Sequence, residues 1–273
     1  MPDFILPSGF ILLRVIGGVT LFAISYFVFI RERILKQDIL RLAICGAFGV
    51  AINQLFFFEG LNLTTPINAA VVMTINPILV IILSLIIINE SITLKKLLGI
   101  FCGLFGAATL ILKDGGVDFS SSYHRGNLLV FINASSYALY LVIVKPLLKK
   151  YHPITILFYV FCFGFLYVTP FGFTSLSEVI WCEIPARVYF EIAFVVVFTT
   201  FVAYLLNSSA LKRLSPTTVS IYIYLQPVLA SLFAVFWGVD RVDMQKTLAA
   251  LLIFIGVYLV STGSFKKRNT KLS

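Results

Sequence analysis

Two charged residues lie within long apolar stretches, where a charged side chain is energetically costly. Arg14 lies about ten residues into the first apolar run, and Glu59 is an acid near the end of the second. If these runs cross a bilayer, a charge near the centre costs at least about 2.5 kcal/mol and is a functional candidate. We predict that Arg14 and Glu59 form an anion-recognition or proton-linked pair. The alternatives are a structural ion pair and an arginine that snorkels to the membrane surface.

Two amide side chains each precede a proline inside an apolar segment: Asn76 before Pro77, and Gln226 before Pro227. Proline inside a helix removes a hydrogen bond and clashes with the preceding turn, at a cost of about 3 kcal/mol. In a bilayer, the freed backbone groups are tolerated where protein or a water-filled cavity covers them. The pair predicts two broken helices that line a central path, and packing kinks are the alternative.

Further polar side chains could line the same path. Tyr222 and Gln226 are four residues apart and share one helix face. The other candidates, at helical spacing on two further segments, are Tyr137, Tyr140, Tyr204 and Asn207. Hydrogen bonds between helices, worth about 0.6 kcal/mol each, would account for any one of them without a substrate.

The elements that position these residues follow from composition. Of the 273 residues, 60% are apolar and 12% are charged, and the mean hydropathy is +1.01. A soluble domain cannot bury that much apolar surface, so we predict an all-α polytopic membrane protein embedded in the lipid bilayer. Nine segments can span: 5–29, 39–60, 67–89, 97–112, 127–148, 154–173, 188–210, 217–238 and 247–264. The fourth is short, and we expect Lys95 and Lys96 to extend it by snorkelling.

Lysine and arginine predict the orientation. Alternate connectors and the C-terminal end hold 15 of the 21 basic residues, and the opposite connectors hold five. Basic residues favour the cytoplasmic side, which predicts a cytoplasmic basic tail at 265–273. The net charge of +9 does not indicate nucleic acid, because the basic residues are spread over short connectors.

The sequence repeats itself at a constant shift of 150 residues. The shift aligns Pro66 with Pro216, Pro77 with Pro227, Asn76 with Gln226, Glu90 with Asp240 and Gly106 with Gly256. The predicted topology makes the copies inverted, which is typical of secondary transporters. We predict a first repeat at 1–113 with four helices and a second at 126–264 with five. The counterpart of the 127–148 span would lie before Met1. We expect that the start site has been assigned too late, and a natural short variant is the alternative. Glu90 and Asp240 are interpreted as connector residues.

These features resemble the EamA-type halves of the drug/metabolite transporter superfamily. Residues 61–111 have a Thr-rich turn, a mid-helix proline, an acid before the next helix and a glycine-rich helix. Residues 211–260 resemble the second half of the family's proteins, and residues 6–18 resemble the family's second helix. The resemblance implies a ten-helix, 5+5 inverted-repeat fold lacking its first helix here, and the movement of small metabolites, often outward.

The predicted function is a secondary transporter, an exporter of small organic metabolites such as amino acids, in a bacterial inner (plasma) membrane. A passive facilitator and a non-transporting scaffold are the alternatives. No hydrolase, metalloprotease or nucleotide-binding motif is present, so we expect neither an enzyme nor a cofactor. Four widely spaced cysteines give no metal pattern. Proton coupling and a homodimer stay open. Gly99 and Gly103 form a G-x-x-x-G pattern, for which we expect close helix packing within the fold, with a dimer surface as the alternative.

Overall fold

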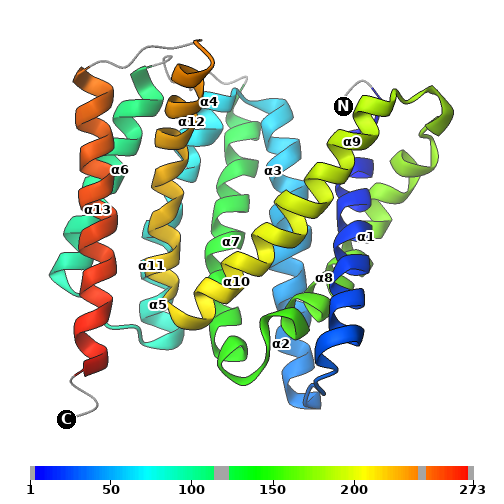
Figure 1. Ribbon diagram of the computed structural model, residues 1–273, viewed down its shortest axis with the longest axis horizontal. Helices are drawn as coiled ribbons and strands as arrows, with labels where there is room; N and C mark the ends of the chain where they lie inside the picture. Colours follow the sequence, from blue (N-terminus) through cyan, green and yellow to red (C-terminus); the bar gives the residue numbers. More distant parts are fainter. Residues whose placement is uncertain (1–3, 114–122, 239–243, 270–273) are drawn as a thin grey trace. The chain divides into compact units, whose positions relative to one another are not determined.

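The computed structural model describes residues 4–113, 123–238 and 244–269, and every regular element in these ranges is helical (Figure 1). Eight helical segments among these residues are long and apolar enough to cross a membrane. Their bounds are Pro7–Ile30, Lys36–Leu63, Pro66–Ile88, Leu94–Leu112, His124–Lys150, Pro153–Ser177, Ala186–Arg213 and Met244–Thr262. The predicted all-α polytopic fold is therefore confirmed.

Several spans are composite. The first joins α1 (Pro7–Ser25) to the π-helix η1 (Tyr26–Ile30), and the second joins α2 (Lys36–Gly46), the π-helix η2 (Ala47–Ala51) and α3 (Ile52–Leu63). The third is divided into α4 (Pro66–Met73) and α5 (Asn76–Ile88), while α6 (Leu94–Lys113), α7 (His124–Lys150) and α8 (Pro153–Ser177) are continuous. After the 3₁₀ turn η4 (Trp181–Glu183), α9 (Ala186–Phe194), the π-helix η5 (Val195–Val202) and α10 (Ala203–Arg213) form one span.

The predicted span 217–238 folds in three consecutive pieces. These are α11 (Pro216–Ser220), the 3₁₀ turn η6 (Ile221–Tyr224) and α12 (Leu225–Phe236). This segment is not among the eight spans given above, so the described residues hold eight spans where the sequence predicted nine. The last helix, α13 (Met244–Asn269), includes the start of the predicted basic tail; residues 270–273 lie outside the described part, as does Asp240.

The chain forms two compact units that do not follow the two sequence repeats. Unit 1 comprises residues 1–59 and 143–213, and unit 2 comprises residues 60–142 and 214–273. Each unit therefore combines helices from both halves of the chain. The division into two repeats, 1–113 and 126–264, stays a prediction about sequence, because it groups the helices differently from these spatial units.

In unit 1, α1 and α8 pack side by side along their lengths. Ser8 and Ser175 share a hydrogen bond of 2.9 Å near one end, and the rings of Tyr26 and Phe158 stack at 4.8 Å near the other. Residue numbers rise along α1 as they fall along α8, so the two helices are antiparallel. Both begin with proline at the first turn, where its missing N–H and fixed φ suit a helix start.

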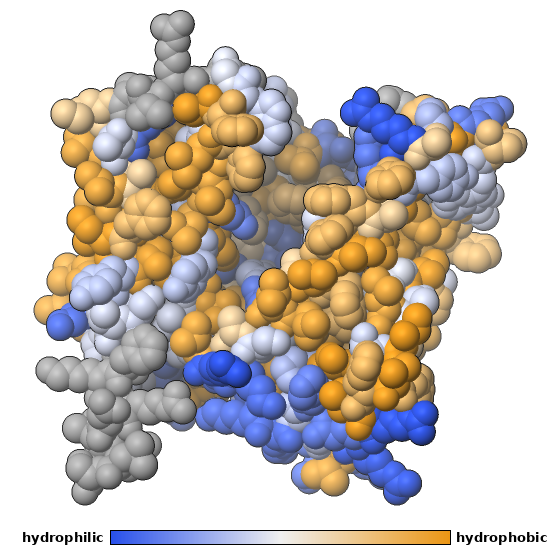
Figure 2. Space-filling model, in the orientation of Figure 1, coloured by the Kyte–Doolittle hydropathy of each residue, from blue (hydrophilic) through white to orange (hydrophobic). Residues whose placement is uncertain are grey.

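A polar network closes one end of unit 1. Buried Asp38 accepts hydrogen bonds from Lys150 Nζ at 3.0 Å and from the Tyr151 hydroxyl at 2.8 Å. The main-chain N–H of His152 donates to Glu32 at 2.8 Å, and burial lowers the pKa of the His152 imidazole. Figure 2 shows hydrophilic side chains gathered at this end of the unit, where the α1–α2 and α7–α8 connections lie. The network thus ties these two connections together.

In unit 2, α6 and α13 pack closely over glycines. A Cβ atom on Gly256 would lie 2.5 Å from the Gly99 carbonyl oxygen, and one on Gly106 would lie 2.7 Å from the Ala249 carbonyl oxygen. These contacts make α6 and α13 antiparallel, and residues 94–113 and 244–263 are equivalent at the shift of 150. Gly99 and Gly103 face helices of their own chain, Gly103 against the Tyr224 ring. They serve packing within the fold, and their G-x-x-x-G spacing is not a reason to expect a dimer.

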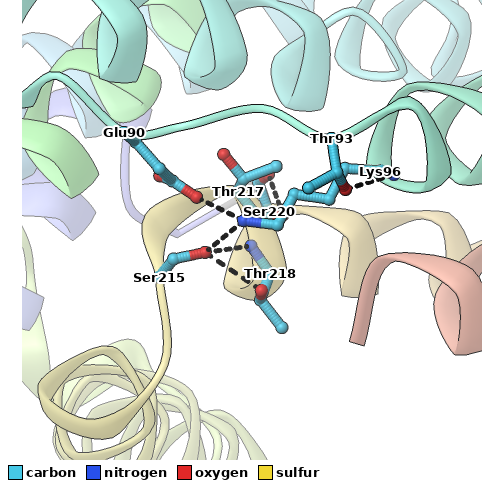
Figure 3. Close-up of polar contacts among 7 residues, drawn as sticks. All are labelled: Glu90, Thr93, Lys96, Ser215, Thr217, Thr218 and Ser220. Atoms are coloured by element: carbon cyan, nitrogen blue, oxygen red, sulfur yellow. Dashed lines mark hydrogen bonds and ion pairs between the residues drawn. The ribbon is translucent and has the colours of Figure 1, made fainter. Parts of the chain in front are cut away.

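A buried ion pair links the α5–α6 connection to the first turn of α6 and lies beside Ser215, the residue before α11 (Figure 3). Lys96 Nζ donates to Glu90 Oε1 at 2.7 Å and lies 3.5 Å from Ser215 Oγ. The Lys96 and Glu90 side chains are 5% and 10% exposed. Ser215 in turn accepts a hydrogen bond from the N–H of Thr218 and caps α11. The prediction that Lys96 snorkels to the surface is therefore wrong, because this carboxylate holds it inside; Glu90 does lie in a connector, as predicted.

Candidate functional site

The candidate site is a polar cluster around Arg14 in unit 1. Arg14 is the eighth residue of the span Pro7–Ile30 and is half-buried. Its Nε donates to the Thr200 hydroxyl at 3.2 Å, and its guanidinium carbon lies 5.6 Å from the centre of the Phe58 ring. That distance is within the range of a cation–π interaction. The charge is thus held by a hydroxyl and an aromatic face.

The predicted ion pair between Arg14 and Glu59 is wrong. Glu59 is exposed, and no ion pair joins the two side chains in the part of the chain that the structure describes. Glu59 lies one residue after Phe58 on α3, and successive residues of a helix point about 100° apart. The ring, not the carboxylate, is therefore the side chain presented to Arg14.

Tyr204 and Gln54 extend the cluster. The Gln54 amide nitrogen lies 3.5 Å from the Tyr204 hydroxyl, which donates to the carbonyl oxygen of Gly49 at 3.2 Å. Gln54 is buried, and its Oε1 has no hydrogen-bond partner within the described ranges. The Tyr204 ring packs edge-on against Phe161 at 5.0 Å. Tyr204, on the seventh span, interacts electrostatically with Arg14, and Gln54, on the second span, contacts Tyr204.

Two π-helical turns position these groups. Thr200 lies in η5, and Gly49, whose carbonyl binds Tyr204, lies in η2. A π-turn inserts an extra residue into the helix and shifts the faces on either side of it, and such turns are frequent at functional sites. Regular helical spacing does not predict this alignment, because the register changes within the span.

Sequence reasoning identified Arg14 and Tyr204 but missed Gln54, Phe58 and Thr200. One signal could have found Gln54: it lies 150 residues before Tyr204, the same shift that aligns the two repeats. Unit 2 holds a second contact at this spacing, between Thr74 and Tyr224. Equivalent residues of two repeats touch where a local two-fold axis passes between them. Phe58 and Thr200 carry no such signal.

The cluster has the chemistry of an anion site. Arg14 uses Nε for Thr200, and its two terminal nitrogens have no hydrogen-bond partner among the residues described. A guanidinium with two free parallel N–H groups matches a carboxylate in a bidentate geometry. The low dielectric of a membrane interior strengthens such an interaction. The arrangement can therefore hold a small carboxylate or a similar anion.

The first broken helix lies in unit 2, where α4 ends at Met73 and α5 begins at Asn76. Because Ile78 N–H bonds to the Ile75 carbonyl, the Thr74 carbonyl is left over, and the buried Tyr224 hydroxyl donates to it at 2.9 Å. Asn76 is buried and donates from Nδ2 to the Ala134 carbonyl at 2.8 Å. A pocket of about 380 Å³ lies against the break, between α4, α5, α6 and α7.

The remaining predicted site residues are distributed over both units. In unit 1, Asn207 is half-buried one turn from Tyr204. In unit 2, the Tyr137 and Tyr140 rings stack on α7 with centroids 6.3 Å apart. Pro77 is buried and Pro227 half-buried, whereas Tyr222 and Gln226 are exposed. Of the predicted residues, Arg14 and Tyr204 thus belong to one cluster, while Asn76 and Pro77 belong to the break in α4–α5.

The antiparallel equivalent helices and the eight apolar spans define a polytopic membrane protein with an inverted-repeat fold. The model of the EamA-like transporter family matches residues 3–112 and again residues 124–262. The Bacillus subtilis protein named Uncharacterized transporter YyaM is 28% identical over 246 residues, which cover 89% of this chain and 80% of the relative. An Archaeoglobus fulgidus protein named Uncharacterized transporter is 26% identical over 257 residues, or 94% and 89% of the two chains.

A solved crystal structure has the same fold, with a TM-score of 0.77 over 95% of this chain and 88% of that chain, at 19% identity. The chain belongs to the EamA-like transporter family. It is accordingly a membrane transporter, and the function of the cluster can be discussed on that basis.

Proposed function

We propose that this protein is a secondary transporter that exports small organic metabolites bearing a carboxylate, such as amino acids or related compounds. Arg14 would bind the carboxylate, and Tyr204 would lie beside it. The observation that carries the proposal is a half-buried cation within a membrane span whose terminal nitrogens have no described partner. Leaving such a charge unpaired is costly in a bilayer, which favours a role in binding.

The energy source that we propose for transport is an ion gradient. No nucleotide-binding motif is present, so accumulation would draw on an ion gradient. Inverted repeats with broken helices suit alternating access. The moving bodies would be the two compact units, because each already combines helices of both repeats. Glu59, an exposed acid on α3, is the first residue to test for proton coupling.

The orientation is part of the proposal. The distribution of basic residues, 15 of 21 on one set of connectors and the C-terminal end, supports a cytoplasmic C-terminus in a bacterial inner membrane. A C-terminal fluorescent-protein fusion should be bright and a C-terminal alkaline-phosphatase fusion inactive. The reverse result would refute this topology.

The test of function compares the metabolites of cells and of their medium with and without the gene. Cells that express the wild-type protein should enrich the medium in one or a few carboxylates, and Arg14→Gln should abolish that enrichment at equal membrane expression. Arg14→Lys should keep part of it, since the charge remains but the bidentate geometry is lost. Arg187→Gln is the matched control, because Arg187 is exposed and paired with Glu191.

Unchanged export by Arg14→Gln would refute the assignment of Arg14. No difference between wild-type and empty cells in any metabolite, in either direction, would favour the non-transporting scaffold. Counterflow without accumulation driven by pH would favour the passive facilitator.

A further inference from the structure

Tyr222 and Gln226 form an exposed polar face on the second broken helix, in unit 2. Tyr222 is 45% exposed and Gln226 is also exposed. Neither side chain has a hydrogen-bond partner within the described ranges. Gln226 is the middle residue of the stretch Pro216–Phe236, ten residues from either end. At 1.5 Å per residue it lies roughly 15 Å from both ends, at mid-depth of a bilayer.

An amide at this depth cannot face lipid without cost. A polar group without a partner in the hydrocarbon region costs several kcal/mol, so exposed polar groups there line water-filled cavities or contact protein. The local structure favours the same conclusion. The 3₁₀ turn η6 and Pro227 interrupt regular α-helical bonding at this point, and irregular backbone at membrane depth is tolerated where it faces water or protein. The Tyr222–Gln226 face therefore faces water or protein, and not lipid.

The equivalent residues of the first repeat are used differently. At the shift of 150, Gln226 corresponds to Asn76 and Tyr222 to Val72. Asn76 is fully buried, and its amide nitrogen is committed to the Ala134 carbonyl. Val72 carries no polar group. At these equivalent positions of the described chain, the second repeat presents an exposed amide and an exposed phenol. The first holds an apolar side chain and a buried amide, whose Oδ1 has no described partner. This difference means that the second break, and not the first, exposes polar side chains at its surface.

Resting on the proposed transport function, we propose that the Tyr222–Gln226 face determines which side chains the transporter accepts. The face offers an amide and a hydroxyl, each able to donate and to accept, and it carries no charge. It would select transported molecules that have a neutral hydrogen-bonding group attached to an apolar part, such as an amide or a phenol. A site built to hydrogen-bond such a group rejects the analogue that lacks it.

The experiment uses the full chain in proteoliposomes and two matched pairs of probes. Tyrosine and phenylalanine differ by one hydroxyl, and glutamine and methionine are similar in size but differ in the amide. The wild-type protein should transport tyrosine and glutamine in preference to their partners. Gln226→Met should reduce the preference within both pairs by about tenfold, the equivalent of one hydrogen bond. Tyr222→Phe should reduce it less, because the ring is kept.

Lys96→Met, which breaks the buried ion pair with Glu90, is the control for structural damage. It should lower the thermal midpoint of unfolding and leave the preference of the folded protein unchanged, whereas Gln226→Met should leave the midpoint unchanged. Transport of all four probes with the same preference in wild type and Gln226→Met would overturn this inference alone. No transport of any probe by the wild-type protein would overturn both this inference and the proposed amino-acid substrate.

Discussion

Removing Lys96 should destabilise the protein far more than removing an exposed lysine or arginine with the same ion-pair geometry. The Lys96–Glu90 pair has an N–O distance of 2.7 Å, and its side chains are only 5% and 10% exposed. Lys96→Met leaves the Glu90 carboxylate buried, with Oε2 already lacking a described partner. Removing one partner of a buried pair costs about 3–5 kcal/mol, because the remaining charge stays unpaired in a low dielectric.

The control is the pair Arg187–Glu191. Its N–O distance is 2.9 Å, but its side chains are 88% and 38% exposed. An exposed pair four residues apart on a helix is worth about 0.3–0.5 kcal/mol, since water already solvates both charges. Arg187→Met should therefore cost about a tenth of what Lys96→Met costs. The N–O distances of the two pairs differ by only 0.2 Å. The expected difference in the cost of the two substitutions therefore comes from burial.

The assay is unfolding in mixed detergent micelles by titration with sodium dodecyl sulfate, followed by circular dichroism at 222 nm. A double variant, Glu90→Met with Lys96→Met, should recover most of the loss, because the unpaired carboxylate is gone as well. A cost below about 1 kcal/mol for Lys96→Met, or one equal to that of the exposed control, would refute the argument. So would a double variant as unstable as the two single changes added together.

Three further predictions concern single residues. Tyr224→Phe should cost about 1–3 kcal/mol in the same titration, because it leaves the buried Thr74 carbonyl unsatisfied, while Tyr222→Phe, which removes an exposed hydroxyl, should cost nothing measurable. Gly256→Leu should lower the thermal midpoint sharply, since its Cβ would lie 2.5 Å from a main-chain oxygen of α6; an unchanged midpoint would contradict the close packing of α6 and α13. Burial lowers the pKa of His152, so the unfolded chain takes up its proton first. The free energy of unfolding should therefore fall as the pH drops below about 6.5, the usual histidine pKa, and that part of the pH dependence should be absent in His152→Asn.

Much of the fold could be predicted from local properties of the sequence. The apolar runs predicted the spans, because a bilayer requires about 20 apolar residues in a row. The division of α4 from α5 was predicted from Pro77, since a proline removes a backbone hydrogen bond and clashes with the preceding turn. The partner of the break could not be predicted locally: the break frees the Thr74 carbonyl for the Tyr224 hydroxyl, because the Ile78 N–H bonds to the nearer Ile75 carbonyl instead.

The partners of the candidate site could not be predicted in the same way. Arg14 was expected to meet an acid, but it meets Thr200 and Phe58. Thr200 lies in a π-helical turn, which moves its side chain away from the position that 3.6 residues per turn would give it. Lys96 was expected at the surface, and the carboxylate of Glu90 keeps it inside.

The sequence by itself determined that the chain is a membrane protein, where its helices lie, where they break and which residues are equivalent in its two repeats. Each of these properties depends on residues close together in the chain or on a constant shift along it. The tertiary structure decided which helices share a compact unit, which side chains reach Arg14 and which of two equivalent amides is left exposed. These depend on contacts between spans distant in the sequence, and on π and 3₁₀ turns that change the helix face on which a residue lies.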